Sequence, residues 1–369
     1  MRLLNAAIIA CLFQIGNLTV SAQTSQHLEP DGLVASDDIP LRLRAGPGLD
    51  FAVLDLLPDG TPLAITGRTA DSDWLQVHTL DQYRAGWVYS EYVNTFIDLQ
   101  TRPISTSQLS FPHLISGISD NARLIFQRGQ TRGNHPNVFA KVGDSITASY
   151  HMFQPIGEGR YDLSDYDYLQ PAIDYFRQTE PGRNNFTRRS VATGVGWNAA
   201  AALLPAFADP NQCLPDEIPL VCEYRLIRPA FALIMFGTND VGYVPDIDYR
   251  HNLERIVRLS IEHGVVPVVS TIPPRIGYDE KVLRFNQIVR DIASQFDVPL
   301  WDYHYAMAFY ARTSLAFDGV HPSLPPRGHE DAASFRQENL PYGYVLRNLS
   351  ALHVLDALWR EVVLDMTNP

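Results

Sequence analysis

From about residue 118 to the end of the chain, short apolar runs alternate with longer segments of helical periodicity. Residues 231–236 form the clearest apolar run, and such a run is typical of a strand that is buried on both faces. Strands separated by helices of ten or more residues form a parallel sheet, because the connecting helices must cover both of its faces. We therefore predict an α/β fold for residues 118–369, a three-layer α/β/α, flavodoxin-like parallel sheet. Further strands are expected at 139–142, 265–271 and 298–301, and helices at 122–126, 168–179, 197–204, 252–263, 280–295 and 346–364.

Residues 33–97 show a different pattern, in which short β-rich runs alternate with turns that contain Gly and Pro. Closely spaced strands of this kind predict a small all-β barrel. With its Arg-Ala-Gly-Pro turn near residue 46, its Trp-x-x-Val run from Trp74 and its Gly-Trp-Val run around Trp87, the segment resembles the bacterial Src-homology-3-like domain. That resemblance implies a role in binding cell-wall peptide or glycan. Trp74 and Trp87 themselves are interpreted as core residues of the barrel, with ligand binding as the alternative.

Residues 98–117 are rich in Ser, Thr, Pro and Gln and show little periodicity. A segment of this composition between two patterned regions is predicted to be a linker. The expected order is therefore a signal peptide, the barrel at 33–97, the linker at 98–117 and the α/β domain at 118–369.

The first residues have the pattern of an export signal. Arg2 is followed by an apolar stretch at 6–13 and by the small residues Val20-Ser21-Ala22, so residues 1–22 are predicted to be a cleaved signal peptide. We therefore expect a secreted or periplasmic protein. The apolar stretch is shorter than the roughly 20 residues that cross a bilayer, and no later segment of the sequence is long enough, so no transmembrane segment is expected. The formal net charge of −12, without a cluster of Lys and Arg, argues against a nucleic-acid partner.

Cys213 and Cys222 have eight residues between them. In an exported chain, two cysteines at this spacing predict a disulfide that closes a small surface loop. The alternatives are two reduced thiols or a zinc site, and a zinc site needs additional ligands that the neighbouring sequence does not supply.

Four short polar motifs contain residues that are suited to catalysis. They are Gly143-Asp144-Ser145-Ile146, Gly194-Val195-Gly196, Gly237-Thr238-Asn239-Asp240 and Asp318-Gly319-Val320-His321. Three of the four lie at predicted carboxyl ends of strands or at helix starts, where open α/β sheets bind their ligands. A serine hydroxyl becomes a nucleophile when a histidine takes its proton, and a carboxylate on the other ring nitrogen fixes the tautomer. Each motif alone also fits a helix cap or a turn, but together they predict a hydrolase.

In this order the motifs resemble the SGNH (GDSL-type) hydrolase family, over roughly residues 136–369. The first, third and last blocks of the family are matched, and the second, usually an Asn-containing run that ends in glycine, is matched only in part. The resemblance implies that Ser145 attacks an ester carbonyl, His321 acts as general base and then general acid, and Asp318 orients the imidazole. It also implies an oxyanion hole formed by the N–H groups of Ser145 and Gly196 and by the amide of Asn239. Gly194 remains an alternative to Gly196.

No cofactor and no metal is expected. His321, His329 and Asp331 together could ligate a metal, but their spacing fits no regular helix or strand site. The other histidines, including His151, His304 and His329, are interpreted as solvent-exposed or packing residues. Asp240 either binds the adjacent backbone or is simply a turn residue, and the sequence leaves both possibilities open.

The combined prediction is a secreted serine esterase that hydrolyses carboxylic esters through an acyl-enzyme on Ser145. The resemblance allows acetyl esters on polysaccharides, fatty-acyl esters and lysophospholipids. A wall- or glycan-binding barrel favours removal of acetyl groups from a carbohydrate or cell-wall polymer. The alternatives are a lipase-like or lysophospholipase-like acyl hydrolase, and a catalytically silent protein that binds wall or glycan.

Overall fold

The computed structural model of the chain describes residues 29–51, 53–80, 84–105, 114–177, 184–310 and 313–365. The predicted signal peptide, residues 1–22, lies outside the described residues. Within the described ranges, no helix has both the length and the apolar character that crossing a membrane requires.

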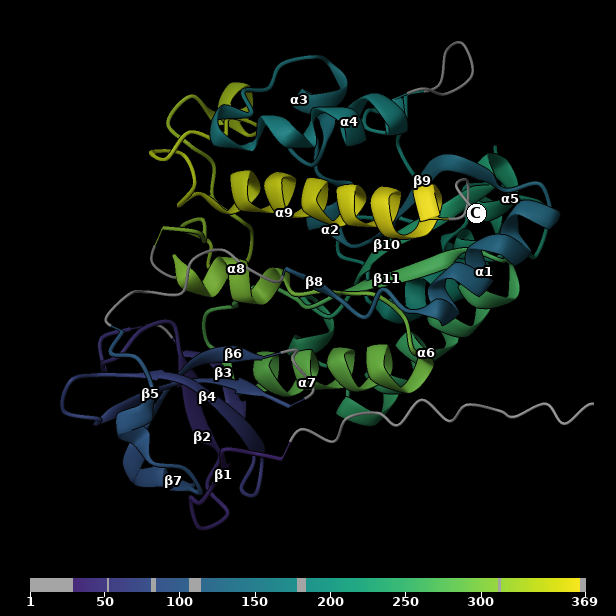
Figure 1. Ribbon diagram of the computed structural model, residues 1–369. Coiled ribbons are helices and arrows are strands. Elements are labelled where there is room, and N and C mark those ends of the chain that lie inside the picture. The colour runs from purple at the N-terminus through teal and green to yellow at the C-terminus, as the bar shows by residue number, and fades with distance from the viewer. Residues whose placement is uncertain are drawn as a thin grey trace, which may run out of the picture.

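An antiparallel sheet of seven strands occupies the N-terminal part of the chain, with the strand order β3-β2-β6-β5-β4-β1-β7 (Figure 1). Buried and half-buried side chains alternate along β5, as expected when one face of a strand packs on a core. The buried face contributes to an apolar cluster that includes Leu43, Leu57, Leu75 and Val77. The predicted all-β domain is therefore confirmed. Its strands are β1 (Gly32–Val34), β2 (Leu41–Arg44), β3 (Val53–Leu57), β4 (Pro62–Arg68), β5 (Trp74–Thr79), β6 (Ala85–Tyr89) and β7 (Val93–Thr95).

The two tryptophans of this domain have different environments. Trp87 is completely buried, as predicted for a core residue. Trp74 is half-buried and lines a surface groove with Tyr89 and Tyr92. Its ring meets that of Tyr89 edge-to-face, with the centroids 5.5 Å apart. We call the groove lined by Trp74, Tyr89 and Tyr92 the barrel groove.

Residues 98–117, predicted to be a linker, carry local structure at both ends. The backbone carbonyl of Leu99 accepts a hydrogen bond from the Arg68 Nε at 2.9 Å, and residue 104 forms a β-bridge with Arg68. At the other end, strand β8 (Ile115–Ser116) pairs with the second sheet. Residues 106–113 lie outside the described part of the chain.

The second sheet has five strands in the order β8-β12-β11-β10-β9. Strands β9 (His135–Gly143), β10 (Pro229–Met235), β11 (Val266–Ser270) and β12 (Leu300–Trp301) are parallel, and β8 is antiparallel to β12. Every residue of β10 is buried, because helices cover both faces of the sheet. The predicted α/β fold with a parallel sheet is confirmed.

The helices form two layers around this sheet (Figure 1). Phe126 and Phe176, from two helices far apart in sequence, both pack on the ring of Phe231 in β10 and so cover the same face. On the other face, the stacked rings of Tyr249 and Phe285 join two neighbouring helices. The first layer contains α1 (Asp120–Thr131), α4 (Gln170–Arg177) and α9 (Gly343–Leu358), and the second contains α5 (Pro219–Ile227), α6 (Asp246–Glu262) and α7 (Asp279–Phe296).

The helix predicted at 197–204 is instead a 3₁₀ turn over Ala199–Leu203. Pro205 disfavours helical dihedrals at the residue before it, and Leu204 is extended, with φ −117° and ψ 124°. Four helices were not predicted, because each is short or begins inside a loop. They are α2 (Ser145–Ala148), α3 (Gln154–Gly157), α5 and α8 (Tyr303–Phe309).

The barrel packs against α7 and α8 (Figure 1). Tyr305 of α8 contacts a small apolar cluster formed by Ala45, Leu54 and Trp87 of the barrel. Beside this cluster, Arg290 of α7 forms an ion pair with the barrel. The two domains therefore share a buried interface in addition to the covalent connection.

Candidate active site

Ser145 begins helix α2 directly after strand β9. A Cβ atom on Gly143, the last residue of the strand, would lie 2.4 Å from the Thr147 Oγ1, so only glycine fits there. Asp144 caps the helix, and its Oδ1 accepts a hydrogen bond from the Ile146 N–H at 2.9 Å. This turn places Ser145 at the carboxyl edge of the parallel sheet, where α/β folds hold their ligands.

The side chains of Ser145, His321 and Asp318 form one continuous hydrogen-bonded row. The Ser145 Oγ lies 3.0 Å from the His321 Nε2, and the His321 Nδ1 lies 2.7 Å from the Asp318 Oδ2. The structure thus brings together three residues that are up to 176 positions apart in sequence. The side chains of His321 and Asp318 are each about 40% exposed, so the row is open to a substrate from solvent.

Asp318 is held in the ionised form by its hydrogen bonds. Its Oδ1 accepts the backbone N–H groups of Val320 and His321 at 2.9 and 3.0 Å. Burial alone would raise the pKa of Asp318, but these N–H groups and the His321 ring together lower it below its ordinary value. An ionised Asp318 favours the His321 tautomer that carries its proton on Nδ1. The Nε2 lone pair then faces the Ser145 hydroxyl.

The loop between α4 and the 3₁₀ turn at Ala199–Leu203 distinguishes the two glycines that the sequence left open. The Gly194 N–H donates to the Gly143 carbonyl at 3.2 Å, and a Cβ on Gly194 would collide with the Trp197 ring at 2.2 Å. Gly194 therefore uses its N–H to attach the loop to the Ser145 turn. Gly196 has a φ of +75°, which favours glycine, and open space where a Cβ would lie. Gly196 is the better candidate for an N–H that faces a substrate.

Asn239 follows strand β10 and is attached to the same loop. Its Nδ2 donates to the Trp197 carbonyl at 2.8 Å, which leaves the second hydrogen of the amide for another acceptor. Asp240 is fully buried, and its Oδ1 accepts the Ala199 N–H at 3.0 Å. Burial raises the pKa of Asp240 to about 6. Asp240 is therefore a bridge between two loops rather than a simple turn residue.

Arg347 is a buried residue beneath the site that the sequence analysis missed. It lies on α9 and is 1% exposed, and its Nη2 donates to the Thr147 Oγ1 at 3.0 Å. Its guanidinium stacks on Trp301 and Tyr303, 4.8 and 4.9 Å from the ring centroids. Burial raises the pKa of Asp144, and the positive charge of Arg347 opposes that rise. The available signal was that Arg347 is the one charged residue in the stretch 343–352.

Two of the histidines interpreted as solvent-exposed or packing residues, His151 and His329, form a pair. The Nδ1 atoms of His151 and His329 lie 3.2 Å apart, and the His329 ring lies over Tyr150 with the centroids 4.1 Å apart. His329 is thus directed toward His151, whereas His321 is occupied by Ser145 and Asp318. The structure therefore does not bring the ligand atoms of His321, His329 and Asp331 together as a metal site.

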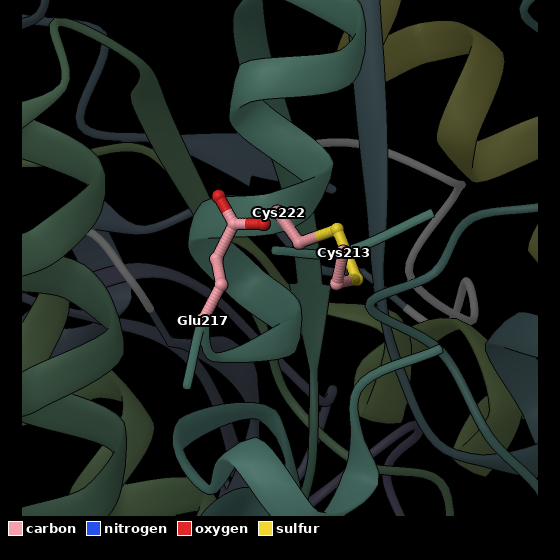
Figure 2. A group of neighbouring side chains, drawn as sticks. All are labelled: Cys213, Glu217 and Cys222. Carbon is pink, nitrogen blue, oxygen red and sulfur yellow. A yellow bond between two sulfur atoms is a disulfide. The ribbon is translucent and has the colours of Figure 1, made fainter. Parts of the chain in front are cut away.

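Cys213 and Cys222 are joined in a disulfide, as predicted (Figure 2). With Glu217, they form the one group of three His, Cys, Asp or Glu side chains in the described part of the chain whose ligand atoms are close enough for a metal. Glu217 is also occupied, because Arg225 donates to both of its carboxylate oxygens at 2.8 Å. This cluster therefore fastens the loop that leads into α5.

A cavity of about 330 Å³ lies beside the Ser145 turn, and we call it the side cavity. Thr147 and Ser149, which follow Ser145, line it on one side, and Thr193 and Val195, which precede Gly196, line it on another. Most of its wall residues are polar or charged. The cavity thus has a polar wall next to the Ser145 turn.

Comparisons with known proteins agree with the two domains. The model of the GDSL-like lipase/acylhydrolase family matches residues 142–330, and that of the bacterial SH3 domain matches residues 40–94. The first match covers about half of the chain and contains Ser145, Asp318 and His321. A search of curated protein sequences finds no match.

Several solved structures resemble about three fifths of the chain. A lipase/acylhydrolase from Enterococcus faecalis is 20% identical, with 60% of this chain and 95% of that chain covered and a TM-score of 0.38. A psychrotrophic esterase from Pseudoalteromonas sp. is 16% identical, with 63% and 100% covered and a TM-score of 0.38. An acetylxylan esterase from Geobacillus stearothermophilus, as a catalytic mutant, is 18% identical, with 61% and 93% covered and a TM-score of 0.37.

Proposed function

Because the chain belongs to the GDSL-like lipase/acylhydrolase family and is a carboxylic ester hydrolase, we propose that Ser145, His321 and Asp318 form its catalytic triad. The observation that carries this proposal is the 3.0 Å contact between the Ser145 Oγ and the His321 Nε2, with Asp318 2.7 Å from the other ring nitrogen.

In the proposed reaction the Ser145 Oγ attacks the ester carbonyl while the His321 Nε2 takes its proton. The tetrahedral intermediate then collapses, and His321 returns the proton to the departing alcohol oxygen. A water molecule attacks the remaining acyl-enzyme, again with His321 as base, and releases the carboxylic acid and free Ser145. Asp318 stays ionised throughout, orients the imidazole and stabilises its protonated form.

The negative oxygen of each tetrahedral intermediate needs preorganised donors. We assign this role to the N–H groups of Ser145 and Gly196 and to the side-chain amide of Asn239. The hydrogen bonds from Gly194 to Gly143 and from Asn239 to Trp197 support this assignment, because they fix all three donors relative to one another. Donors that are fixed before the reaction need no reorganisation in the transition state.

For the substrate, we favour removal of short acyl groups, above all acetyl, from a carbohydrate or cell-wall polymer outside the cytoplasm. The polar wall of the side cavity suits sugar hydroxyls better than a fatty-acyl chain. The aromatic side chains of the barrel groove offer flat apolar surface of the kind on which sugar rings stack. The disulfide is consistent with an oxidising compartment.

One observation favours an acyl-lipid substrate as the second candidate. Phe317, next to Asp318, is fully exposed, and Val195, next to Gly196, is 84% exposed. Exposed apolar side chains on both sides of a site are suited to contact with a lipid surface.

A substrate series distinguishes these candidates and tests the triad. The wild-type protein is assayed on p-nitrophenyl esters of two to twelve carbons and on acetylated polysaccharide, in parallel with Ser145→Ala. We expect the highest kcat/KM on the acetyl ester, release of acetate from the polysaccharide, and loss of both activities in Ser145→Ala. A kcat/KM that rises steadily with acyl length would favour the lipid candidate. Activity in Ser145→Ala would exclude Ser145 as nucleophile.

A catalytically silent binding protein is tested by labelling with a fluorophosphonate probe. We expect labelling of the wild type at Ser145 and no labelling of Ser145→Ala. A folded wild-type protein that neither takes up the probe nor hydrolyses any of the esters would support the silent alternative.

A further inference from the structure

A lysine lies in the middle of a buried strand close to Ser145. Lys141 belongs to β9, is 7% exposed and forms part of the wall of the side cavity. Its Nζ donates to the backbone carbonyl of Phe186 at 3.1 Å. Across the described ranges, no carboxylate forms an ion pair with it, and the neighbouring charge that affects it is the like charge of Arg188. Lys141 is therefore a buried amine whose protein partner is neutral.

Such a residue is costly for the fold. Burial and the nearby Arg188 lower the pKa of Lys141 to about 7, because both oppose the charged form. The adjacent strand residues Phe139, Ala140 and Val142 are apolar and buried, and an apolar residue at 141 would avoid this cost. Costly buried ionisable groups are concentrated at functional sites, so a ligand is the natural reason for this one.

Two arginines, Arg188 and Arg189, line the same cavity. The Arg188 guanidinium already has partners within the protein, because it forms an ion pair with the fully buried Glu223 and its Nη1 donates to the Arg189 carbonyl at 2.8 Å. Glu223 also accepts the Val191 N–H at 3.0 Å, so this network fixes the backbone of the loop. The Arg189 side chain is exposed, and it lines the cavity.

The uncompensated positive charge of the side cavity wall comes from Lys141 and Arg189, because Glu223 neutralises Arg188. The part of the wall that the structure describes contains no Asp or Glu. Thr147, Ser149 and Thr193 add hydroxyl groups to this wall. Each hydroxyl already has one partner in the protein: Thr147 accepts from Arg347, Ser149 accepts from the His151 N–H, and Thr193 donates to the Ser190 carbonyl. The volume of about 330 Å³ is at the lower end of the range for small-ligand pockets.

We propose that the side cavity binds a carboxylate of the substrate next to the ester that Ser145 cleaves, so that the enzyme prefers acetylated acidic sugars over neutral ones. This specificity rests on the proposed function, because it assigns the group that lies beside the reacting ester. An ammonium and a guanidinium form charge-assisted hydrogen bonds with a carboxylate. The polar wall suits the hydroxyl groups of the remaining sugar, whereas a fatty-acyl chain would offer this wall no hydrogen-bond partner.

Ligand binding tests the proposal without requiring turnover. The Ser145→Ala protein is titrated by calorimetry with glucuronic acid, with glucose as the neutral analogue and with inorganic phosphate. We expect glucuronate to bind at least about tenfold more tightly than glucose, the effect of one charge-assisted hydrogen bond. Equal affinities, or no binding of glucuronate, would overturn the proposal. Tighter binding of phosphate than of glucuronate would overturn the carboxylate assignment and indicate a phosphate-bearing substrate.

Variants locate the binding to the cavity. Arg189→Gln and Lys141→Met are each expected to weaken glucuronate binding by about tenfold. Arg128→Gln, which removes an exposed charge from α1, should change it less than about twofold. If Lys141→Met does not fold, the exposed Arg189 still provides the test. Unchanged glucuronate affinity in Arg189→Gln, or an equal loss in Arg128→Gln, would contradict the assignment.

A kinetic comparison separates this proposal from the proposed function. In wild-type protein we expect a higher kcat/KM on acetylated polygalacturonate than on acetylated neutral xylan. In Arg189→Gln the ratio of the two values should fall about tenfold, mainly through KM of the acidic substrate. If wild type hydrolyses both polymers and the ratio is the same in Arg189→Gln, the carboxylate site is wrong and the proposed function stands. If wild type hydrolyses no ester while glucuronate still binds, the proposed function is wrong and the site stands.

Discussion

Asp55 of the barrel lies 2.7 Å from Arg290 of helix α7, and both side chains are almost completely buried. Arg290 also forms an ion pair with Asp302 at 3.0 Å. Burial alone would raise the pKa of Asp302, but the positive charge of Arg290 outweighs it, and the pKa is lowered. One arginine therefore connects a barrel strand to the residue that follows the last parallel strand of the catalytic sheet.

Asp55→Ala should destabilise the whole protein, because it leaves Arg290 buried with a single counter-ion. We expect the free energy of unfolding to fall by about 3 kcal/mol, as when one partner of a buried pair is removed. Urea denaturation measures this loss. Asp50→Ala, an exposed position in the same domain, is the control, and equal effects of the two substitutions would contradict a structural role for the buried pair.

Asn239→Ala tests the proposed oxyanion hole. Loss of one preorganised donor should lower kcat on p-nitrophenyl acetate by about a hundredfold or more. The substitution also removes the hydrogen bond to the Trp197 carbonyl, so the free energy of unfolding must be measured on the same sample. Asn211→Ala, in an exposed loop, is the matched control. A folded Asn239→Ala enzyme with the wild-type kcat would remove this amide from the hole.

Lys141→Met should raise the free energy of unfolding, and the gain should depend on pH. The pKa of Lys141 is about 7 in the folded protein and 10.5 as an ordinary lysine, so between these values the unfolded state binds more protons. The stability of the wild type is therefore lowered most below pH 7 and recovers as the pH rises toward 10.5. The gain from Lys141→Met should be larger at pH 6 than at pH 9.5.

Chemical denaturation at the two pH values measures this difference. Lys281→Met is the control, because Lys281 also donates to a backbone carbonyl, that of Val244 at 2.8 Å, but is only half-buried. It should show a smaller dependence on pH. A gain from Lys141→Met that is the same at both pH values would mean that the ammonium is not buried in solution.

Reduction of the Cys213–Cys222 disulfide should lower the free energy of unfolding by about 2–3 kcal/mol, the loop-closure entropy expected for so short a loop. Thermal unfolding with and without reductant measures the loss. The Cys213→Ser/Cys222→Ser double variant should unfold at the same temperature in both conditions. If the unfolding temperature of the wild-type protein is also the same with and without reductant, the contact between Glu217 and Arg225 holds the loop rather than the disulfide.

The sheet and the proximity of Ser145, His321 and Asp318 could be predicted because their signals are local. Residues 231–236 are apolar at every position, which is what burial on both faces requires, and β10 is found there. Gly143 and Asp144 specify the tight turn that presents Ser145, through a close approach and a helix cap. Asp318 and His321 are three residues apart, so their contact depends on one loop.

The features that were missed depend on contacts between distant segments. Arg347 meets Thr147 across 200 positions, and His151 meets His329 across 178, and nothing in the neighbouring residues specifies either partner. Lys141 looked like one polar residue in an apolar strand, and its environment is created by the loop around Phe186. The 3₁₀ turn at Ala199–Leu203 has the composition of an α-helix, but Pro205 prevents it from continuing.

The buried pair between Asp55 and Arg290 also determines how the barrel can serve the enzyme. If only a flexible linker joined the two domains, the distance between the barrel groove and Ser145 would vary. The largest possible distance would then depend on the length of the linker. Here the Asp55–Arg290 pair and the contact of Tyr305 with the barrel hold the two domains together, so the interface sets the separation between the barrel groove and Ser145. Lengthening the segment that connects the two domains would therefore leave the distance between the barrel groove and Ser145 unchanged.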